Sequence, residues 1–195
     1  MDQPLKWLPE DGGLPVPPGF IVYRSTPEAN VRSAYEELKI REKTHFVAVR
    51  GPTHAVLNVI GPDPLVHTLR RLCSESPDAP VLVQRMVHSM WCGKAQWHGS
   101  SLTITANEGM MLLDPDTYSN GVAVLAPKQR KMIRHVDGTA RIIEREQPLE
   151  LIPGELLTKI TTLAEKTGTD IGWAIDDLEK IWLLAGGKTS ATNGI

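Results

Sequence analysis

The stretch DIGWAIDDLEKIWLLAGGKTS, residues 170–190, has the pattern of a β-hairpin. Apolar side chains alternate with small or polar ones over residues 171–175, which is typical of a strand with one buried face. Residues 176–179 are suited to a turn, and residues 181–184 form a second apolar run. The segment therefore predicts two paired strands.

Three segments before this hairpin have the apolar spacing of helices. They are residues 27–38, 63–73 and 153–168. We expect Ser25 or Thr26 to cap the first helix, and Asp63 to cap the second with Pro64 at its first position. Gly168 is suited to end the third helix because glycine readily adopts a left-handed conformation.

The other apolar runs are short and predict strands. Residues 45–51 and 54–61 are split by a Gly-Pro turn and predict a tight strand pair, and residues 81–87 are apolar enough for a buried central strand. Further strands are expected at residues 20–23, 94–98, 101–108, 121–126, 131–136 and 139–146. The pattern therefore predicts an α+β fold with antiparallel strands and about three helices.

Composition excludes several classes of protein. The chain has 195 residues and a formal net charge of -2, and no basic run alternates with aromatic residues, so we expect no binding to nucleic acid. The N-terminal residues lack a signal peptide, and no apolar run is long enough to cross a membrane, which favours a cytoplasmic protein. Cys73 and Cys92 have no CxxC spacing and are expected to be reduced thiols.

Two motifs with catalytic or metal-binding chemistry fail on inspection. GGKTS, residues 186–190, lacks the first glycine of a phosphate-binding loop and the helix that must follow it. His88, Cys92 and His98 are chemically suited to zinc, but their spacing matches no recurring ligand pattern. We therefore predict no metal site.

Six segments occur in the order found in a known family. They are GGLPVPPGF (12–20), VAVRG (47–51), LNVIGPDPLVHTLRRLCS (57–74), PVLVQRMV (80–87), PDTY (115–118) and DIGWAIDDLEKIWLL (170–184). Together they resemble the N-terminal ATP-binding domain of phosphoenolpyruvate synthase and pyruvate phosphate dikinase. The resemblance implies a compact, truncated fold of ATP-grasp type, whose family members clamp Mg-ATP between two lobes.

The sequence departs from the family where the resemblance implies catalysis. In the family, a Glu and a Gln of the C-terminal hairpin hold magnesium, and an Arg meets phosphate. The corresponding positions are Gly172, Ala185 and Gly187. Without these groups the charge of the γ-phosphate is not neutralised, so the resemblance implies that dikinase chemistry is lost. Whether the chain is an enzyme of another kind stays open.

Other positions keep the family pattern. The resemblance matches Arg50 to a phosphate-side arginine and residues 84–86 to a strand that lines the nucleotide pocket. We expect a cleft with residues 81–91 as its floor and with Arg50, Glu108 and Tyr118 at its edges. The expected ligand-binding residues are Arg50, Gln84, Met86, Trp91 and Tyr118. Glu108 and His88 are candidates for proton transfer if they are buried, and ordinary surface residues otherwise.

Three functions are consistent with these residues. The leading hypothesis is a repurposed domain that binds, and in one version transforms, a small molecule of a specialised bacterial pathway, with no cofactor. The first alternative is a residual phosphotransferase that binds Mg-ATP and needs partner domains. The second alternative is a non-catalytic interaction module that pairs with itself or with another chain through exposed strand edges. We expect one domain over residues 1–195, or a small lobe (14–75) and a β-rich lobe (79–186), with a flexible tail at 187–195.

Overall fold

The computed structural model describes residues 5–8, 13–109, 130–134, 140–144 and 153–186. These residues form two compact units. The first unit contains residues 5–8 and 17–86, and the second contains residues 13–16 and the described residues from 87 onward. The described residues contain three helices and antiparallel sheets, so the expected α+β class is confirmed. The division into one domain or two lobes stays a prediction.

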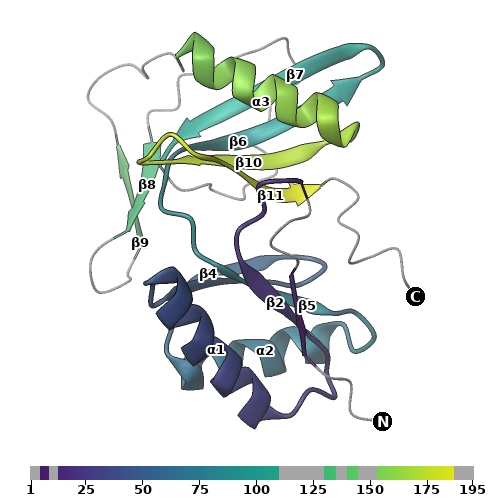
Figure 1. Ribbon diagram of the computed structural model, residues 1–195, viewed down its shortest axis with the longest axis vertical. Helices are drawn as coiled ribbons and strands as arrows, with labels where there is room; N and C mark the ends of the chain where they lie inside the picture. Colours follow the sequence, from purple (N-terminus) through teal and green to yellow (C-terminus); the bar gives the residue numbers. More distant parts are fainter. Residues whose placement is uncertain (1–4, 9–12, 110–129, 135–139, 145–152, 187–195) are drawn as a thin grey trace. The chain divides into compact units, whose positions relative to one another are not determined.

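The first unit is a five-stranded sheet with two helices (Figure 1). Its elements are β1 (Lys6–Trp7), β2 (Gly19–Val22), α1 (Glu28–Glu42), β3 (Phe46–Arg50), β4 (Ala55–Ile60), α2 (Pro62–Glu75) and β5 (Val81–Arg85). The strand order is β1-β2-β5-β3-β4, and all neighbours are antiparallel. The apolar run of residues 81–85 therefore forms the expected central strand.

The two helices cover one face of this sheet and enclose its apolar core. Alternate strand residues, such as Phe20, Val49 and Val83, contribute to that core, together with Leu38 of α1 and Leu72 of α2. Because neighbouring residues of a strand point to opposite faces, the residues between them face away from the helices. This opposite face carries the candidate site described below.

Both helices of the first unit begin differently from the expectation. Pro27 is the N-cap of α1, and the Oγ1 atom of Thr26 instead accepts a hydrogen bond from the Tyr23 amide at 3.0 Å. The helix α2 begins at Pro62, with Gly61 rather than Asp63 as its N-cap. Proline has a fixed φ that suits the first helical position and has no N–H to satisfy there, which explains the earlier start of α2.

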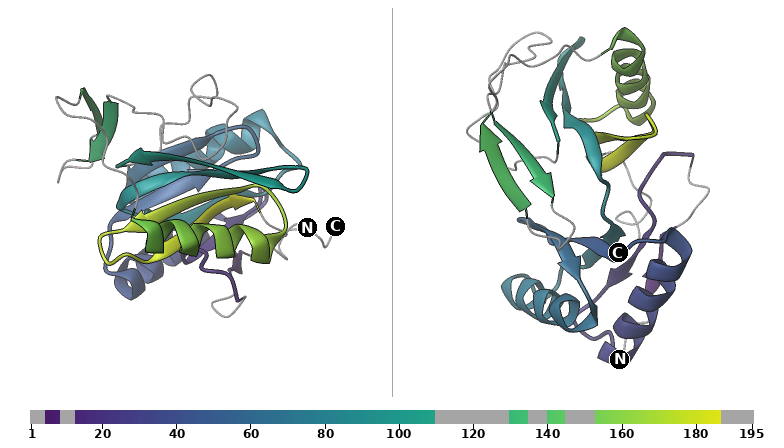
Figure 2. Two further views of the ribbon diagram at one scale, coloured as in Figure 1. Left: turned by 90° about the horizontal axis from the view of Figure 1, so that it is seen from above. Right: turned by 90° about the vertical axis from the view of Figure 1, so that its left-hand side faces the viewer.

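The second unit is a four-stranded sheet covered on one face by a helix (Figure 2). Its elements are β6 (Ser89–His98), β7 (Ser101–Glu108), α3 (Gly154–Thr167), β10 (Ile171–Asp176) and β11 (Ile181–Gly186), in the strand order β11-β10-β6-β7. A separate antiparallel pair joins β8 (Arg130–Arg134) and β9 (Ala140–Glu144). The expected strand at residues 121–126 lies outside the described residues, as does the expected tail at 187–195.

The C-terminal hairpin forms as its sequence predicts. The strands β10 and β11 are antiparallel, and β10 also pairs with β6. The fully buried Trp173 packs in a core with Ile160 and Leu163 of α3. Gly168 ends α3 in a left-handed conformation with φ 63°, as expected. None of the helices among the described residues has the length and apolar character that crossing a membrane requires.

Candidate functional site

Arg50 lies at the end of β3, on the face of the first sheet opposite the helices. Its strand neighbour Val49 belongs to the helix-side core, which directs Arg50 to the other face. Gln84 of the adjacent strand β5 follows the core residue Val83 and therefore shares the face of Arg50. The sequence separates Arg50 and Gln84 by 34 positions, and the antiparallel pairing of β3 and β5 brings them together.

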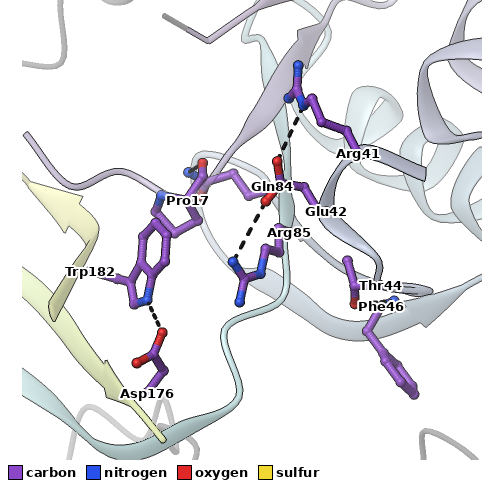
Figure 3. Close-up of polar contacts among 9 residues, drawn as sticks. All are labelled: Pro17, Arg41, Glu42, Thr44, Phe46, Gln84, Arg85, Asp176 and Trp182. Atoms are coloured by element: carbon purple, nitrogen blue, oxygen red, sulfur yellow. Dashed lines mark hydrogen bonds and ion pairs between the residues drawn. The ribbon is translucent and has the colours of Figure 1, made fainter. Parts of the chain in front are cut away.

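A chain of hydrogen bonds fixes the orientation of Arg50. Its Nε atom donates to Oε1 of Gln84 at 3.1 Å, and Nε2 of Gln84 donates to the carbonyl oxygen of Pro17 at 3.1 Å. Figure 3 shows the contact between Gln84 and Pro17. Gln84 is 2% exposed, so the amide is held between a backbone acceptor and the guanidinium. Such a fixed amide positions the arginine without neutralising its charge.

The charge of Arg50 has no acidic partner in the part of the chain that the structure describes. Arg50 is half-buried, and desolvation by burial lowers the pKa of its guanidinium from the ordinary value of 12.5. An arginine nevertheless stays protonated at physiological pH, so the strand end carries a partly desolvated cation. The remaining guanidinium N–H groups are suited to a carboxylate or phosphate, because their planar fork matches two acceptor oxygens.

Gly19 makes room for this arrangement on β2. A Cβ atom at position 19 would lie 2.1 Å from the carbonyl oxygen of Val83 and 2.8 Å from the Cα atom of Gln84. The backbone of β2 therefore approaches β5 more closely here than a side chain permits. The preceding residues Pro17 and Pro18 accept hydrogen bonds from the Gln84 side chain and the Arg85 amide.

Arg85 has a different environment from Arg50. It forms an ion pair with Glu42 of α1 at 3.7 Å, and Glu42 also accepts a hydrogen bond from Nε of Arg41 at 3.3 Å (Figure 3). Arg85 therefore has a carboxylate partner within the first unit. Arg50 is thus the cation of β3 and β5 that the described residues leave without a carboxylate.

The other expected site residues are distributed over both units. Met86 is buried in the first unit, where its amide donates to the carbonyl oxygen of Phe46 at 3.0 Å. Trp91 is buried in the core beneath α3 in the second unit. His88 is exposed. Glu108 ends β7, opposite Trp91 in register.

Tyr118, the remaining expected ligand-binding residue, lies outside the described residues. Of the expected set, the structure joins Arg50 and Gln84 directly. The ligand-binding role of that pair, and the roles of Met86, Trp91, Glu108 and His88, stay predictions. The contribution of Pro17 was not foreseen, because no local pattern indicates which residue a backbone carbonyl 67 positions away will contact.

The hairpin register shows which residues meet at the end of β10 and β11. Gly172 and Ala185 are directly opposite each other across β10 and β11. Neither side chain carries an atom that can coordinate a metal ion. Among the described residues, no three His, Cys, Asp or Glu side chains gather in a way suited to holding a metal ion.

Asp176, whose sequence position indicates an ordinary turn residue, is buried in the hairpin. It is 4% exposed, and its carboxylate accepts hydrogen bonds from the amides of Leu178 and Lys180 and from Nε1 of Trp182. An Asp at the start of a tight turn is the signal that predicts such side-chain to backbone bonding. The buried carboxylate is therefore fully hydrogen-bonded within the hairpin, and its role is structural.

The fold is therefore an α+β arrangement with a polar anchor on one sheet. No protein-family model matches the sequence, and no curated protein matches it. Among solved structures, the chain is similar to the macrocyclase MdnC bound with precursor peptide MdnA from Microcystis aeruginosa, at 14% identity and a TM-score of 0.45. That match covers 88% of this chain and 47% of MdnC.

Two further solved structures have a comparable similarity. D-alanyl-alanine synthetase A from Vibrio cholerae matches at 14% identity and a TM-score of 0.46, covering 91% of this chain and 51% of the synthetase. The ATP-grasp ligase PsnB, complexed with a minimal precursor, matches at 14% identity and a TM-score of 0.45, covering 94% of this chain and 50% of PsnB. The chain thus spans about half the length of each of the three proteins.

Proposed function

We propose that this chain is a repurposed ATP-grasp-like domain of the dikinase type that binds an anionic small molecule through Arg50 and carries out no phosphoryl transfer. The observation that carries this proposal is the hydrogen-bond chain from Arg50 through Gln84 to the Pro17 carbonyl oxygen. It holds a partly desolvated guanidinium in place with a neutral partner. Such a group binds a carboxylate or phosphate strongly because few water molecules compete for it.

The residue chemistry at the hairpin supports the proposed absence of phosphoryl transfer. Phosphoryl transfer relies on positioning and on neutralising negative charge, usually with metal ions held by carboxylates or amides. The opposed residues Gly172 and Ala185 offer neither group. A single fixed arginine can still bind an anion, because binding a ground state needs less charge than stabilising a transition state.

Calorimetric titration tests the proposal. The purified chain is titrated separately with phosphate, pyrophosphate, citrate and ATP, each with and without Mg²⁺. We expect at least one of these anions to bind, equally well without Mg²⁺, and the binding to be lost in Arg50→Ala. Arg71→Ala is the matched control, since it removes an exposed arginine from α2 of the same unit.

The outcomes separate the candidate functions. ATP binding that requires Mg²⁺ contradicts the proposal and favours the residual phosphotransferase. Equal binding by Arg50→Ala and the unmodified chain contradicts the assigned anchor. No heat from any of the four anions up to millimolar concentration contradicts anion binding altogether, and the interaction module then becomes the leading function.

A further inference from the structure

A cavity of about 380 Å³ lies on the helical side of the first unit. It is formed by the end of β2, the beginning of α1 and the part of α2 from Val66 to Ser74. The Arg50 anchor faces away from the helices, so this cavity is a separate site. Its volume is within the range of small-molecule sites, about 300–1,000 Å³.

The floor of the cavity is apolar. It is lined by Val22, Val31, Val66, Leu69 and Cys73, each of which is at most 7% exposed. All five also belong to the core beneath the two helices. A ligand on this floor would therefore extend the apolar core with its own hydrocarbon surface, which favours binding in proportion to the buried area.

The rim of the cavity is charged. Its charged lining residues are Arg24, Glu28 of α1 and Arg70. Glu28 forms an ion pair with Arg70. Among the described residues Arg24 takes part in no hydrogen bond or ion pair. Two positive charges against one negative charge leave the rim complementary to a single negative charge.

From the apolar floor and from Arg24, which pairs with no described residue, we infer that this cavity binds a small amphipathic monocarboxylate, with its hydrocarbon body on the valine and leucine floor and its carboxylate on the guanidinium of Arg24. The planar guanidinium matches the two oxygens of a carboxylate. Arg70 contributes less to binding the carboxylate, because it already forms an ion pair with Glu28.

Cys73 provides a reporter inside the cavity. Burial raises the pKa of its thiol, and the positive charge of Arg24 partly opposes that rise. This effect of Arg24 on the thiol pKa is consistent with a guanidinium that lies close to Cys73 on the cavity floor. A bound ligand would cover the thiol and slow its alkylation, whereas Cys92 of the second unit is 0% exposed and serves as an internal control for unfolding.

The experiment measures alkylation of Cys73 by iodoacetamide in the whole chain, with increasing decanoate or decanol, by mass spectrometry. We expect decanoate to protect Cys73, and decanol, which lacks the charge, to require about tenfold higher concentration for half-protection. Arg24→Gln is expected to raise the decanoate concentration for half-protection by about tenfold and to leave the decanol concentration for half-protection unchanged. The concentration of half-protection is compared rather than the rate, because Arg24 also affects the thiol itself.

Two further variants give the sign of the charge effect. Glu28→Gln removes the competing carboxylate and is expected to tighten decanoate binding. Arg32→Gln is the matched control, since Arg32 lies on the same helix and pairs with Asp63 away from the cavity lining. The inference is overturned if neither compound protects Cys73, if both protect it equally, or if Arg24→Gln behaves like Arg32→Gln. None of these results depends on Arg50, so the outcome is independent of the proposed function.

Discussion

The indole Nε1 of Trp182 donates a hydrogen bond to Oδ2 of Asp176 at 2.7 Å (Figure 3). The other carboxylate oxygen, Oδ1, accepts the amides of Leu178 and Lys180 at 3.1 and 2.9 Å. The ammonium of Lys180 lies 3.9 Å from the centroid of the Trp182 ring. One buried carboxylate therefore closes the turn and joins it to the second strand of the hairpin.

Removing that carboxylate is expected to destabilise the second unit. Asp176→Ala leaves the Trp182 indole and two turn amides without their acceptor, and we expect a loss of about 2–4 kcal/mol in the free energy of unfolding. Urea denaturation followed by tryptophan fluorescence measures it. Asp177→Ala, at the exposed neighbouring position, is expected to change little. Equal effects of the two substitutions would contradict the role of the buried network.

Tyr35 of α1 joins its helix to two connecting segments of the first unit through its hydroxyl group. The hydroxyl donates to the carbonyl oxygen of His45 and accepts the amide of Gly61, each at 2.8 Å. Tyr35→Phe leaves both backbone groups without this partner and is expected to cost about 1–3 kcal/mol in unfolding free energy. Thermal unfolding checks it against Tyr23→Phe, whose hydroxyl has no hydrogen bond among the described residues. A neutral Tyr35→Phe would refute the prediction.

Gly19 is expected to tolerate no side chain. Gly19→Ala places a Cβ atom against the backbone of Val83 and Gln84, so β2 must separate from β5 or the variant must lose stability. We expect a loss of more than about 2 kcal/mol, of the size seen for overpacking. Gly154→Ala at the first residue of α3 meets no atom within 4 Å and is the control. Comparable unfolding midpoints for both variants would contradict this prediction.

The neutrality of Gln84 is expected to matter more than its size. Gln84→Glu keeps an acceptor for Arg50 but places a negative charge beside it and removes the donor to Pro17. If the proposed function is correct, anion affinity falls by about tenfold or more, as it does when a charge-assisted hydrogen bond is lost. Calorimetry with the anion identified for the unmodified chain measures the change. Affinity retained in Gln84→Glu would show that Arg50 is not the anchor.

Cys73 is expected to lower the free energy of unfolding as the pH becomes alkaline. Burial raises the pKa of the folded thiol, so the folded state retains the proton more tightly than the unfolded state. This contribution is complete below the pKa of an unfolded thiol, about 8.5, and is lost as the pH rises through the folded pKa. Unfolding free energies from neutral to alkaline pH should therefore decline more steeply for the unmodified chain than for Cys73→Ala. Parallel pH profiles would disprove the linkage.

Local patterns determined most of the secondary structure. The alternation in residues 171–175 and the turn at 176–179 predicted β10 and β11 because these signals depend on neighbours in sequence. The apolar stripe of residues 153–168 predicted α3 in the same way. The sequence pattern misplaced the starts of α1 and α2. Several residues near each proline-containing start are suited to the N-cap position, and the local pattern does not show which of them is used.

The sequence pattern alone does not predict the polar contacts. Arg50 was singled out by its place at a strand end, but its partner depends on the register between β3 and β5. The cavity floored by Val31 and Cys73 combines residues of two helices and a strand, and no local motif marks it.

The sequence by itself determined the helices, the strands, the α+β class and the absence of metal-binding side chains at Gly172 and Ala185. Each of these follows from residue type or from spacing between near neighbours. The tertiary structure decided that Arg50 meets Gln84, that Asp176 closes the hairpin with Trp182, and that Arg24 lies at an apolar cavity. Those outcomes depend on strand register and helix packing, which bring distant residues together to bury apolar surface while satisfying buried polar groups.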